Sequence, residues 1–245
     1  MSPRITLAVA ERVLLQLRRD PRSIGMVIAV PCVLMLIVEG AFEHQAGTFE
    51  RVGPPMLGLF PLIIMFLITS ITMLRERTTG TLERLMTMPM AKLDLLAGYG
   101  IAFALVAAVQ AAVTVAFAYL VLGLDTPGSA FWVGVLAVAN ALLGTSLGLL
   151  LSAFARTEFQ AVQFMPAFIL PQIFLCGLLV PRDEMAQALD VIAGALPLTY
   201  AYDALAGAAA DEAFAGRLAL DVAVVAGVTV LALALGAATL RRRTS

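Results

Sequence analysis

Six long apolar runs dominate this 245-residue sequence. They cover residues 23–42, 55–74, 95–122, 131–154, 161–180 and 218–240. The hydrocarbon core of a bilayer is about 30 Å thick, so a helix needs about 20 residues to cross it. Unsatisfied backbone groups are costly in lipid, and the runs lack the alternation of barrel strands. The sequence therefore predicts an all-α membrane protein with six transmembrane helices in residues 23–245, preceded by a separate segment, residues 1–22.

The overall composition excludes several other classes of protein. Hydrophobic residues make up 61% of the chain and charged residues 13%, whereas soluble domains have roughly 25% charged residues. A formal net charge of −1 gives no basic surplus for binding nucleic acid. Cys32 and Cys176 both lie in apolar runs, and His44 is the single histidine. A disulfide framework and a Cys/His metal site are therefore excluded.

The basic residues divide unequally between the two sides of the predicted membrane domain. Thirteen of the sixteen lie in the N-terminal segment, the second and fourth connections and the C-terminal tail. Only Arg51, Arg182 and Arg217 fall on the other side. Because basic loops stay in the cytoplasm, this division predicts that both termini are cytoplasmic. We expect a multi-pass protein of the bacterial plasma membrane, in contact with membrane lipids.

Residues 1–22 form a distinct N-terminal segment. A helix over residues 4–19 places apolar and charged side chains on opposite faces, which predicts an amphipathic helix on the cytoplasmic leaflet, ending near Pro21. The apolar face consists of Leu7, Ala10, Val13, Leu14 and Leu17. A solvated leader is an alternative. A signal peptide is disfavoured, because Glu11 and Asp20 fit poorly in its basic region.

The connection between the second and third runs, residues 75–93, has features of a short helix. Gly80 permits a sharp turn, Glu83 suits a helix N-terminus, and Pro89 ends the helix. Leu82, Leu85 and Met86 are three and four residues apart, so they form an apolar ridge on one face of this helix. A helix this short is unstable alone in water, so we expect it to dock on a partner or to pack under its own bundle.

The connection after the fifth run, residues 182–217, is too apolar for a floppy loop. Residues 189–196 are apolar, and a second apolar stretch begins at Pro197, but neither is long enough to span. Short apolar helices interrupted by proline indicate re-entrant or interfacial elements on the outer side.

Three segments together resemble the type-2 permease class of ATP-binding-cassette exporters. Residues 76–85 with Pro89 are similar to the E-R-x-x-G-T-L-E-x-L…P segment of that family. Residues 174–181 are similar to its F-L-S-G-x-x-x-P, with Cys176 in place of the serine. Residues 197–203 are similar to its P-L-T-Y-x-x-D. The order and spacing match, and the resemblance covers essentially the whole chain.

The resemblance implies roles for these segments. Residues 1–22 correspond to the connecting helix, and residues 75–93 contain the coupling helix, which rests on a nucleotide-binding subunit. The implied coupling residues are Glu76, Gly80, Thr81, Leu82, Glu83, Leu85, Met86 and Pro89. The implied residues of the outer re-entrant segment are Gly177, Pro181, Pro197, Tyr200 and Asp203.

The resemblance also implies a division of labour between subunits. The chain has no G-x-x-x-x-G-K-[ST] sequence, so we expect no enzymatic activity and no cofactor on it. ATP and Mg²⁺ are expected on a separate nucleotide-binding ATPase subunit. Two ATPase subunits and a second copy of the chain, or a related permease, complete the implied exporter.

Several polar residues fall within the predicted spans. Gln110, Asn140 and Gln172 lie near mid-bilayer, where interhelical hydrogen bonds are the ordinary explanation and lining of a translocation path is the alternative. The expected path side chains are aromatic, thioether or polar groups on two helices that the resemblance places at the dimer interface. They are Phe60, Met65, Phe66, Thr69, Gln163, Phe164, Phe168 and Gln172. Glu39 and Asp221 lie near outer helix ends, so we expect them to reach the headgroups rather than to relay protons.

One motif suggests an unrelated chemistry. Residues 144–148 match the G-x-S-x-G motif of serine hydrolases, and some six-helix membrane proteases carry it. The only histidine, His44, is outside, while Ser146 lies roughly 20 Å deeper, so no catalytic pair forms. We therefore interpret Gly144 and Gly148 as a patch for close helix packing.

The sequence predicts the permease subunit of an ATP-driven exporter that works by alternating access. Its cargo is expected to be a small amphipathic or lipid-like compound, with drug or antibiotic efflux favoured. The alternative is a stand-alone carrier or receptor without an ATPase partner.

Overall fold

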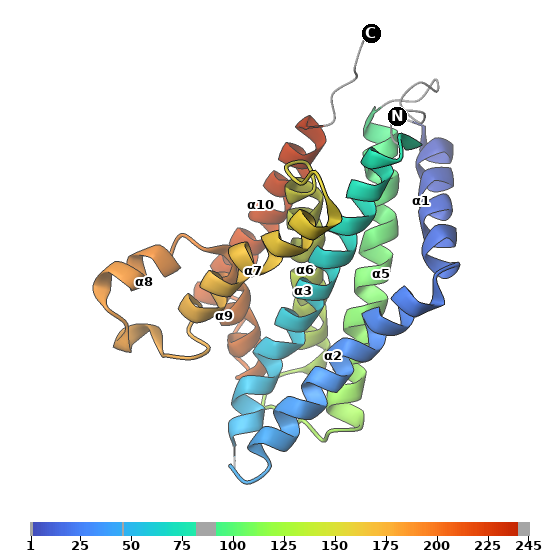
Figure 1. Ribbon diagram of the computed structural model, residues 1–245. Coiled ribbons are helices and arrows are strands. Elements are labelled where there is room, and N and C mark those ends of the chain that lie inside the picture. The colour runs from blue at the N-terminus through green and yellow to red at the C-terminus, as the bar shows by residue number, and fades with distance from the viewer. Residues whose placement is uncertain (1, 46, 82–91, 240–245) are drawn as a thin grey trace.

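The chain folds almost entirely into helices, as the apolar runs predict (Figure 1). The computed structural model describes residues 2–45, 47–81 and 92–239, and no strand occurs within those ranges. The elements are α1 (Pro3–Arg18), α2 (Pro21–Phe42), α3 (Thr48–Thr78), α5 (Lys92–Leu120), α6 (Ala130–Leu151), α7 (Glu158–Leu175), η1 (Arg182–Glu184), α8 (Gln187–Ala193), α9 (Pro197–Ala209) and α10 (Arg217–Ala238). The predicted all-α class is confirmed for the described residues.

Five of these helices are long and apolar enough to cross a bilayer. They are α2, α3, α5, α6 and α10, which correspond to the predicted spans 23–42, 55–74, 95–122, 131–154 and 218–240. The helices α8 and α9 meet at a bend of 85° and add a sixth crossing if they form one broken span. Length and apolarity therefore support five spans, or six with that bent pair.

The predicted span 161–180 differs from the helix that occupies it. Helix α7 ends at Leu175 and runs obliquely across α3 (Figure 1), and it is not among the five spanning helices. Its helical path stops because Gly177 takes a left-handed conformation, with φ +100°, where a side chain is strained. Residues 176–180 therefore form a turn, which corrects the predicted end of this span.

Helices α3 and α5 are longer than a bilayer requires. Their 31 and 29 residues give lengths of about 46 and 43 Å, against about 30 Å of hydrocarbon. Helices α2, α6 and α10 have 22 residues each, or about 33 Å. At the end of the molecule where α1 packs, α3 and α5 run alongside α1 and reach past the bend between α1 and α2 (Figure 1).

The amphipathic α1 has a protein partner for its apolar face. Val9, Ala10 and Val13 are buried in one cluster with Tyr99 and Phe103 of α5. The two helices approach closely at Gly98, where an added Cβ would lie 2.6 Å from Val9. Burying an apolar side chain of this size contributes roughly 1.5–3 kcal/mol. The predicted apolar face of residues 1–22 therefore packs on α5, although Leu7 remains 61% exposed.

Helices α3 and α6 form the most closely packed pair of the bundle. A Cβ added at Gly144 would collide with the carbonyl oxygen of Leu62, and one added at Gly148 with that of Phe66. The predicted small-residue patch is confirmed. Ser146 is fully buried and donates a hydrogen bond to the Leu143 carbonyl oxygen of its own helix, 2.8 Å away.

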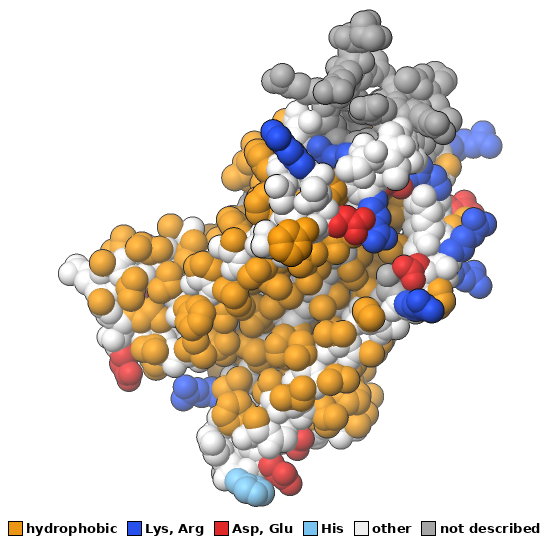
Figure 2. All heavy atoms as spheres, viewed as in Figure 1, with side chains coloured by type: hydrophobic (Ala, Val, Ile, Leu, Met, Phe, Trp, Pro, Cys, Tyr) orange, Lys and Arg blue, Asp and Glu red, His pale blue; other side chains and the backbone are white. Residues whose placement is uncertain are grey.

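Charges separate toward the two ends of the molecule. Figure 2 shows Lys and Arg side chains at the end that carries the start of α1 and the close of α10, an apolar belt below them, and the histidine with acidic groups at the far end. At that far end Trp132 stacks on Phe214 with ring centroids 5.3 Å apart. Aromatic side chains of this kind favour membrane interfaces, so arginines and aromatics mark opposite edges of the apolar belt.

Candidate coupling site

The coupling segment predicted from the sequence begins where α3 ends. The backbone N–H of Thr79 donates to the Arg75 carbonyl oxygen at 2.9 Å, and Gly80 follows with φ +72°. This left-handed glycine is a common helix ending, and it turns the chain away from α3. The predicted coupling residue Gly80 lies in this turn, and Thr81 directly follows it. Residues 82–91 lie outside the described residues, with the predicted Leu82, Glu83, Leu85, Met86 and Pro89.

Glu76, one turn before this ending, joins three helices. Its Oε1 accepts a hydrogen bond from Arg12 Nη2 of α1 at 2.7 Å, and the same nitrogen donates to the Tyr99 hydroxyl of α5 at 2.8 Å. The Arg12 guanidinium also lies over the Tyr99 ring, 5.9 Å from its centroid. Glu76 is only 7% exposed and Tyr99 is fully buried. Removing one member of such a buried pair leaves a buried charge without its partner.

The two neighbours of Glu76 contact two further helices. Arg75 forms a bidentate pair with Glu158 of α7, with nitrogen–oxygen distances of 2.7 and 3.0 Å. The hydrogen bond from Arg75 lowers the pKa of the Glu158 carboxyl. Arg77 Nη2 donates to Thr239 Oγ1, at the end of α10, over 3.4 Å.

Arg75, Glu76 and Arg77, which we name the triplet, therefore connect the end of α3 to helices on different sides of it. Successive residues of an α-helix point about 100° apart, so three in a row face three directions. Because α3 lies inside the bundle, each direction meets a different helix. The triplet contacts α7, then α1 with α5, then α10.

Helix α1 also binds the chain just after residues 82–91. Asp94, in the first turn of α5, is 2% exposed and accepts a hydrogen bond from the Ser2 backbone N–H at 2.9 Å. The Thr6 hydroxyl donates to the same Oδ1 at 3.4 Å. Contacts from α1 therefore hold the chain on both sides of the predicted coupling segment.

A cavity of about 460 Å³ lies between α1 and α3 beside the triplet. Its wall is mixed, with Arg75, Glu76 and Asp20 as charged groups and Val13 and Ile68 among the apolar ones. The structure thus places polar and apolar surface together at this end of the bundle.

The predicted path residues differ in burial. Met65, Phe66 and Thr69 of α3 are fully buried within the chain itself. Phe60 and Phe164 are half-buried, and Phe164 packs against Leu74 of α3. Gln163 and Phe168 of α7 are exposed. The predicted residues that remain accessible in a single chain are thus mainly on α7.

The three mid-bilayer amides make the interhelical hydrogen bonds expected of them. Gln110 donates to the Val27 carbonyl oxygen at 3.1 Å, and Asn140 donates to that of Ala201 at 3.3 Å. Gln172 accepts from the Leu198 backbone N–H at 3.3 Å. These bonds join α5 to α2, α6 to α9, and α7 to α9. The expectation for Asp221 is wrong: this carboxylate is 2% exposed within the bundle and does not reach outward.

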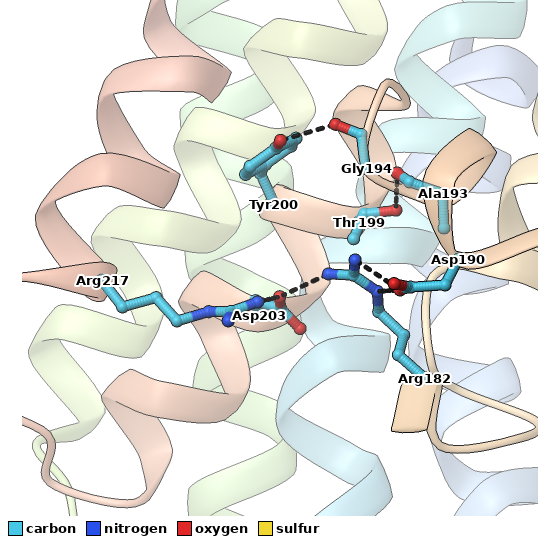
Figure 3. A network of polar contacts seen from close by, with 8 residues as sticks. All are labelled: Arg182, Asp190, Ala193, Gly194, Thr199, Tyr200, Asp203 and Arg217. Atoms are coloured by element: carbon cyan, nitrogen blue, oxygen red, sulfur yellow. Dashed lines mark hydrogen bonds and ion pairs between the residues drawn. The ribbon is translucent and has the colours of Figure 1, made fainter. Parts of the chain in front are cut away.

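The predicted outer segment forms a compact polar network (Figure 3). Pro181 precedes η1, and Pro197 begins α9 at the first helical position, where proline costs no backbone hydrogen bond. The Tyr200 hydroxyl donates to the Gly194 carbonyl oxygen at 2.6 Å, which fastens α9 to the end of α8. Asp203 pairs with Arg217 of α10 at 2.8 Å.

Arg182 completes this network from η1. It pairs with Asp190 of α8 at 2.7 Å and lies 3.8 Å from Asp203. Gly177 makes the turn that leads into the network. The structure therefore brings the five predicted residues of the outer segment into one local unit with Arg182, Asp190 and Arg217.

Sequence reasoning missed several members of the candidate coupling site. It named Glu76 but not its partners, and it assigned no contact to Arg12, Arg75 or Arg77, which it counted among the cytoplasmic charges. Glu158 and Asp94 were not singled out either, although each lies in the first turn of a helix. Tyr99 carries no sequence signal, because a tyrosine inside an apolar run is indistinguishable from a packing residue.

Comparison with known proteins gives consistent matches. Residues 5–209 match the profile of the ABC-2 type transporter family. The probable multidrug ABC transporter permease YbhR of Escherichia coli is 27% identical over 170 residues, which are 69% of this chain and 46% of the relative. ABC transporter G family member 20 of Dictyostelium discoideum is 27% identical over 158 residues, which are 64% of this chain and 21% of the relative. The matched region thus spans less than half the length of these relatives.

Proposed function

Since the chain belongs to the ABC-2 type transporter family, we propose that it is the membrane subunit of an ATP-driven exporter. In this proposal it pairs with a second copy of itself or a related permease. A separate ATPase subunit binds and hydrolyses ATP with Mg²⁺ and seats on residues 82–91. The relatives named as multidrug permeases support a small amphipathic or lipid-like cargo, with drug or antibiotic efflux favoured.

The triplet is the observation that carries this proposal. A force applied to the segment after α3 reaches Arg75, Glu76 and Arg77 first, because they lie in the last turn of α3. Their contacts with α7, α1, α5 and α10 transfer that displacement to four helices at once. Packed helices move as rigid elements with few alternative arrangements, so a small displacement becomes a rearrangement of the bundle.

The charge distribution supports the orientation in this proposal. The arginine-rich end that carries the triplet faces the cytoplasm, where an ATPase has access to ATP, and both termini share that side. The apolar belt holds the chain as a multi-pass protein of the plasma membrane. The network of Arg182, Asp190, Asp203 and Arg217 faces the outside, and α8 and α9 act there as the re-entrant element.

Helix α7 is the proposed contact with the second membrane subunit. Phe159, Phe168 and Phe174 are 70%, 40% and 60% exposed, and the buried residues of α7 are few. A second copy that covers these aromatic side chains buries their apolar surface and packs closely against α7. Gln163 and Phe168 then line an amphipathic path between the two copies, which opens to either side by alternating access.

Co-purification and reconstitution test this function. We expect the chain to bring an ATPase subunit through purification, and cargo to stimulate ATP turnover in vesicles. Leu82→Ala with Leu85→Asp should abolish that stimulation, because it removes the apolar ridge on which docking depends. Val121→Asp, an exposed change at the opposite end, is the control and should leave the stimulation unchanged. Transport by the purified chain alone would instead identify a stand-alone carrier.

A further inference from the structure

A cavity of about 200 Å³ lies in the bend between α1 and α2, against α5. Apolar side chains of all three helices line it. They include Leu14 and Leu17 of α1, Ile24 and Val27 of α2, and Leu105 and Val109 of α5. Leu105 and Val109 are about half exposed, so the cavity is open to the surface of the bundle. A slot of this kind accepts a flexible hydrocarbon chain and offers little to a polar ligand.

The bend itself carries a cluster of cations. Arg18 lines the cavity, and Arg19 and Arg22 follow within four residues. All three side chains are exposed, and within the described ranges none of the three has an ion-pair partner within 4.0 Å. Asp20 is the single carboxylate in this stretch. The bend therefore presents a net positive charge at the mouth of an apolar slot.

The depth of the bend matches the headgroup region of a membrane. Helix α2 crosses from Ile24 to Phe42, and its 19 residues span about 28 Å, close to the thickness of the hydrocarbon core. Arg18 and Arg22 are therefore at the cytoplasmic edge of that core, while Val109 lies inside it. Of the five spanning helices α2 is the least buried, at 17%, so lipid has access to the region around the cavity.

We propose that this cavity is a binding site for an anionic phospholipid of the cytoplasmic leaflet. One acyl chain fills the slot between α1, α2 and α5, and the lipid phosphate binds Arg18 and Arg22. The cytoplasmic leaflet carries the anionic lipids of a membrane, and basic pockets at its edge bind their headgroups. The bound lipid holds α1, the helix that contacts Glu76, at a fixed angle to the first span. This inference concerns a lipid site and does not rest on the exporter function.

Native mass spectrometry of the purified chain in detergent tests the proposal. Dioleoyl phosphatidylglycerol and dioleoyl phosphatidylcholine share their acyl chains and differ in charge. We expect one phosphatidylglycerol per chain, bound at least fivefold more tightly than phosphatidylcholine. Arg18→Ala should weaken phosphatidylglycerol binding about fivefold, as expected for one cation at a membrane surface. Leu105→Trp should block the slot and prevent binding of both lipids.

Two control substitutions are matched to these variants, and two results would contradict the proposal. Arg4→Ala removes an exposed arginine from the far end of α1, and Val113→Trp enlarges an exposed residue two turns further along α5. Both should bind lipid as the original chain does. Equal binding of the two lipids, or full phosphatidylglycerol binding by Leu105→Trp, overturns the proposal. If Leu105→Trp lowers the thermal unfolding midpoint, Arg18→Ala decides, because its side chain is exposed.

A second copy of the chain is the competing occupant of the cavity. In a background with Cys32→Ala and Cys176→Ala, Leu105→Cys should remain monomeric under oxidation if lipid covers the slot. A disulfide-linked dimer at this position would overturn the lipid assignment.

Discussion

The two polar ends of the molecule are held together in different ways. At the triplet end, the contacts join residues far apart in the chain: Arg12 and Glu76 are 64 residues apart, and Arg77 and Thr239 are 162 apart. At the outer end, Arg182 and Asp190 are 8 residues apart, Tyr200 and Gly194 are 6 apart, and Arg217 and Asp203 are 14 apart. Both ends use arginine–carboxylate pairs, but among the described residues only the pairs at the triplet end join residues far apart in the chain.

The two ends therefore have different mechanical roles: the triplet end transfers displacement between helices, and the outer network stabilises one local segment. A contact between distant helices carries a displacement from one to the other, whereas a contact within one short segment keeps that segment rigid. We therefore expect changes at the triplet to affect coupling, and changes in the outer network to affect only local stability.

The largest effect is expected from Glu76→Ala. The Arg12 guanidinium then lies partly buried without its carboxylate, which destabilises the protein by about 3 kcal/mol. The midpoint of thermal unfolding should fall, and stimulation of ATP turnover should be lost. Glu50→Ala, an exposed change at the other end of α3, is the matched control and should alter neither quantity.

Asp203→Ala should have a smaller effect and a different signature. The substitution removes the carboxylate that pairs with Arg217 and lies near Arg182. Because Arg217 is 67% exposed, the free energy of unfolding should fall by only about 1 kcal/mol. Limited proteolysis between α7 and α10 should become faster while stimulated ATP turnover persists. Loss of that stimulation without loss of folding would contradict the distinction between the two ends.

Tyr200→Phe isolates one contact of the outer network. It removes the 2.6 Å hydrogen bond to the Gly194 carbonyl oxygen and keeps the ring, so we expect a loss of about 1 kcal/mol. Hydrogen exchange of the amides of α8 should rise, with no change at the start of α1. Tyr202→Phe on the same helix, for which no hydroxyl hydrogen bond is found among the described residues, serves as the comparison.

The smallest effect is expected at the exposed pair of Arg75 and Glu158. Arg75 lowers the pKa of the Glu158 carboxyl, so the pair contributes stability above the ordinary carboxyl pKa. That contribution is lost as the pH falls through the lowered pKa. Because both groups are largely exposed, it is below about 1 kcal/mol. Glu158→Gln should remove this small acid dependence of the unfolding midpoint, and an unchanged dependence would assign it to other groups.

The sequence was informative where local pattern decides structure. Apolar runs located five spans, Gly144 and Gly148 predicted a close helix contact, and isolated amides predicted interhelical hydrogen bonds. In each case the lipid surroundings or the tight packing leave the residue only one arrangement of low free energy. The three motifs of the resemblance also located the turn at Gly80 and the unit around Tyr200.

What the sequence left undetermined is which helix covers which face. The apolar stripe of α1 is visible in residues 1–22, but its partner, α5, begins about ninety residues later. The pairing of Arg12 with Glu76 and Tyr99 depends on that arrangement, as does the burial of Asp221. The early end of α7 was missed because a single glycine within an apolar run does not reveal its backbone conformation.

The most direct test of the triplet as a transmission element is the double variant Arg12→Leu with Glu76→Leu. Replacing both members of a buried ion pair with apolar residues keeps or improves stability, so folding and assembly should be retained. We expect ATP to be hydrolysed still at the basal rate, while cargo moved per ATP falls at least tenfold in reconstituted vesicles. An unchanged amount of cargo per ATP, in an assembly of normal stability, would contradict it.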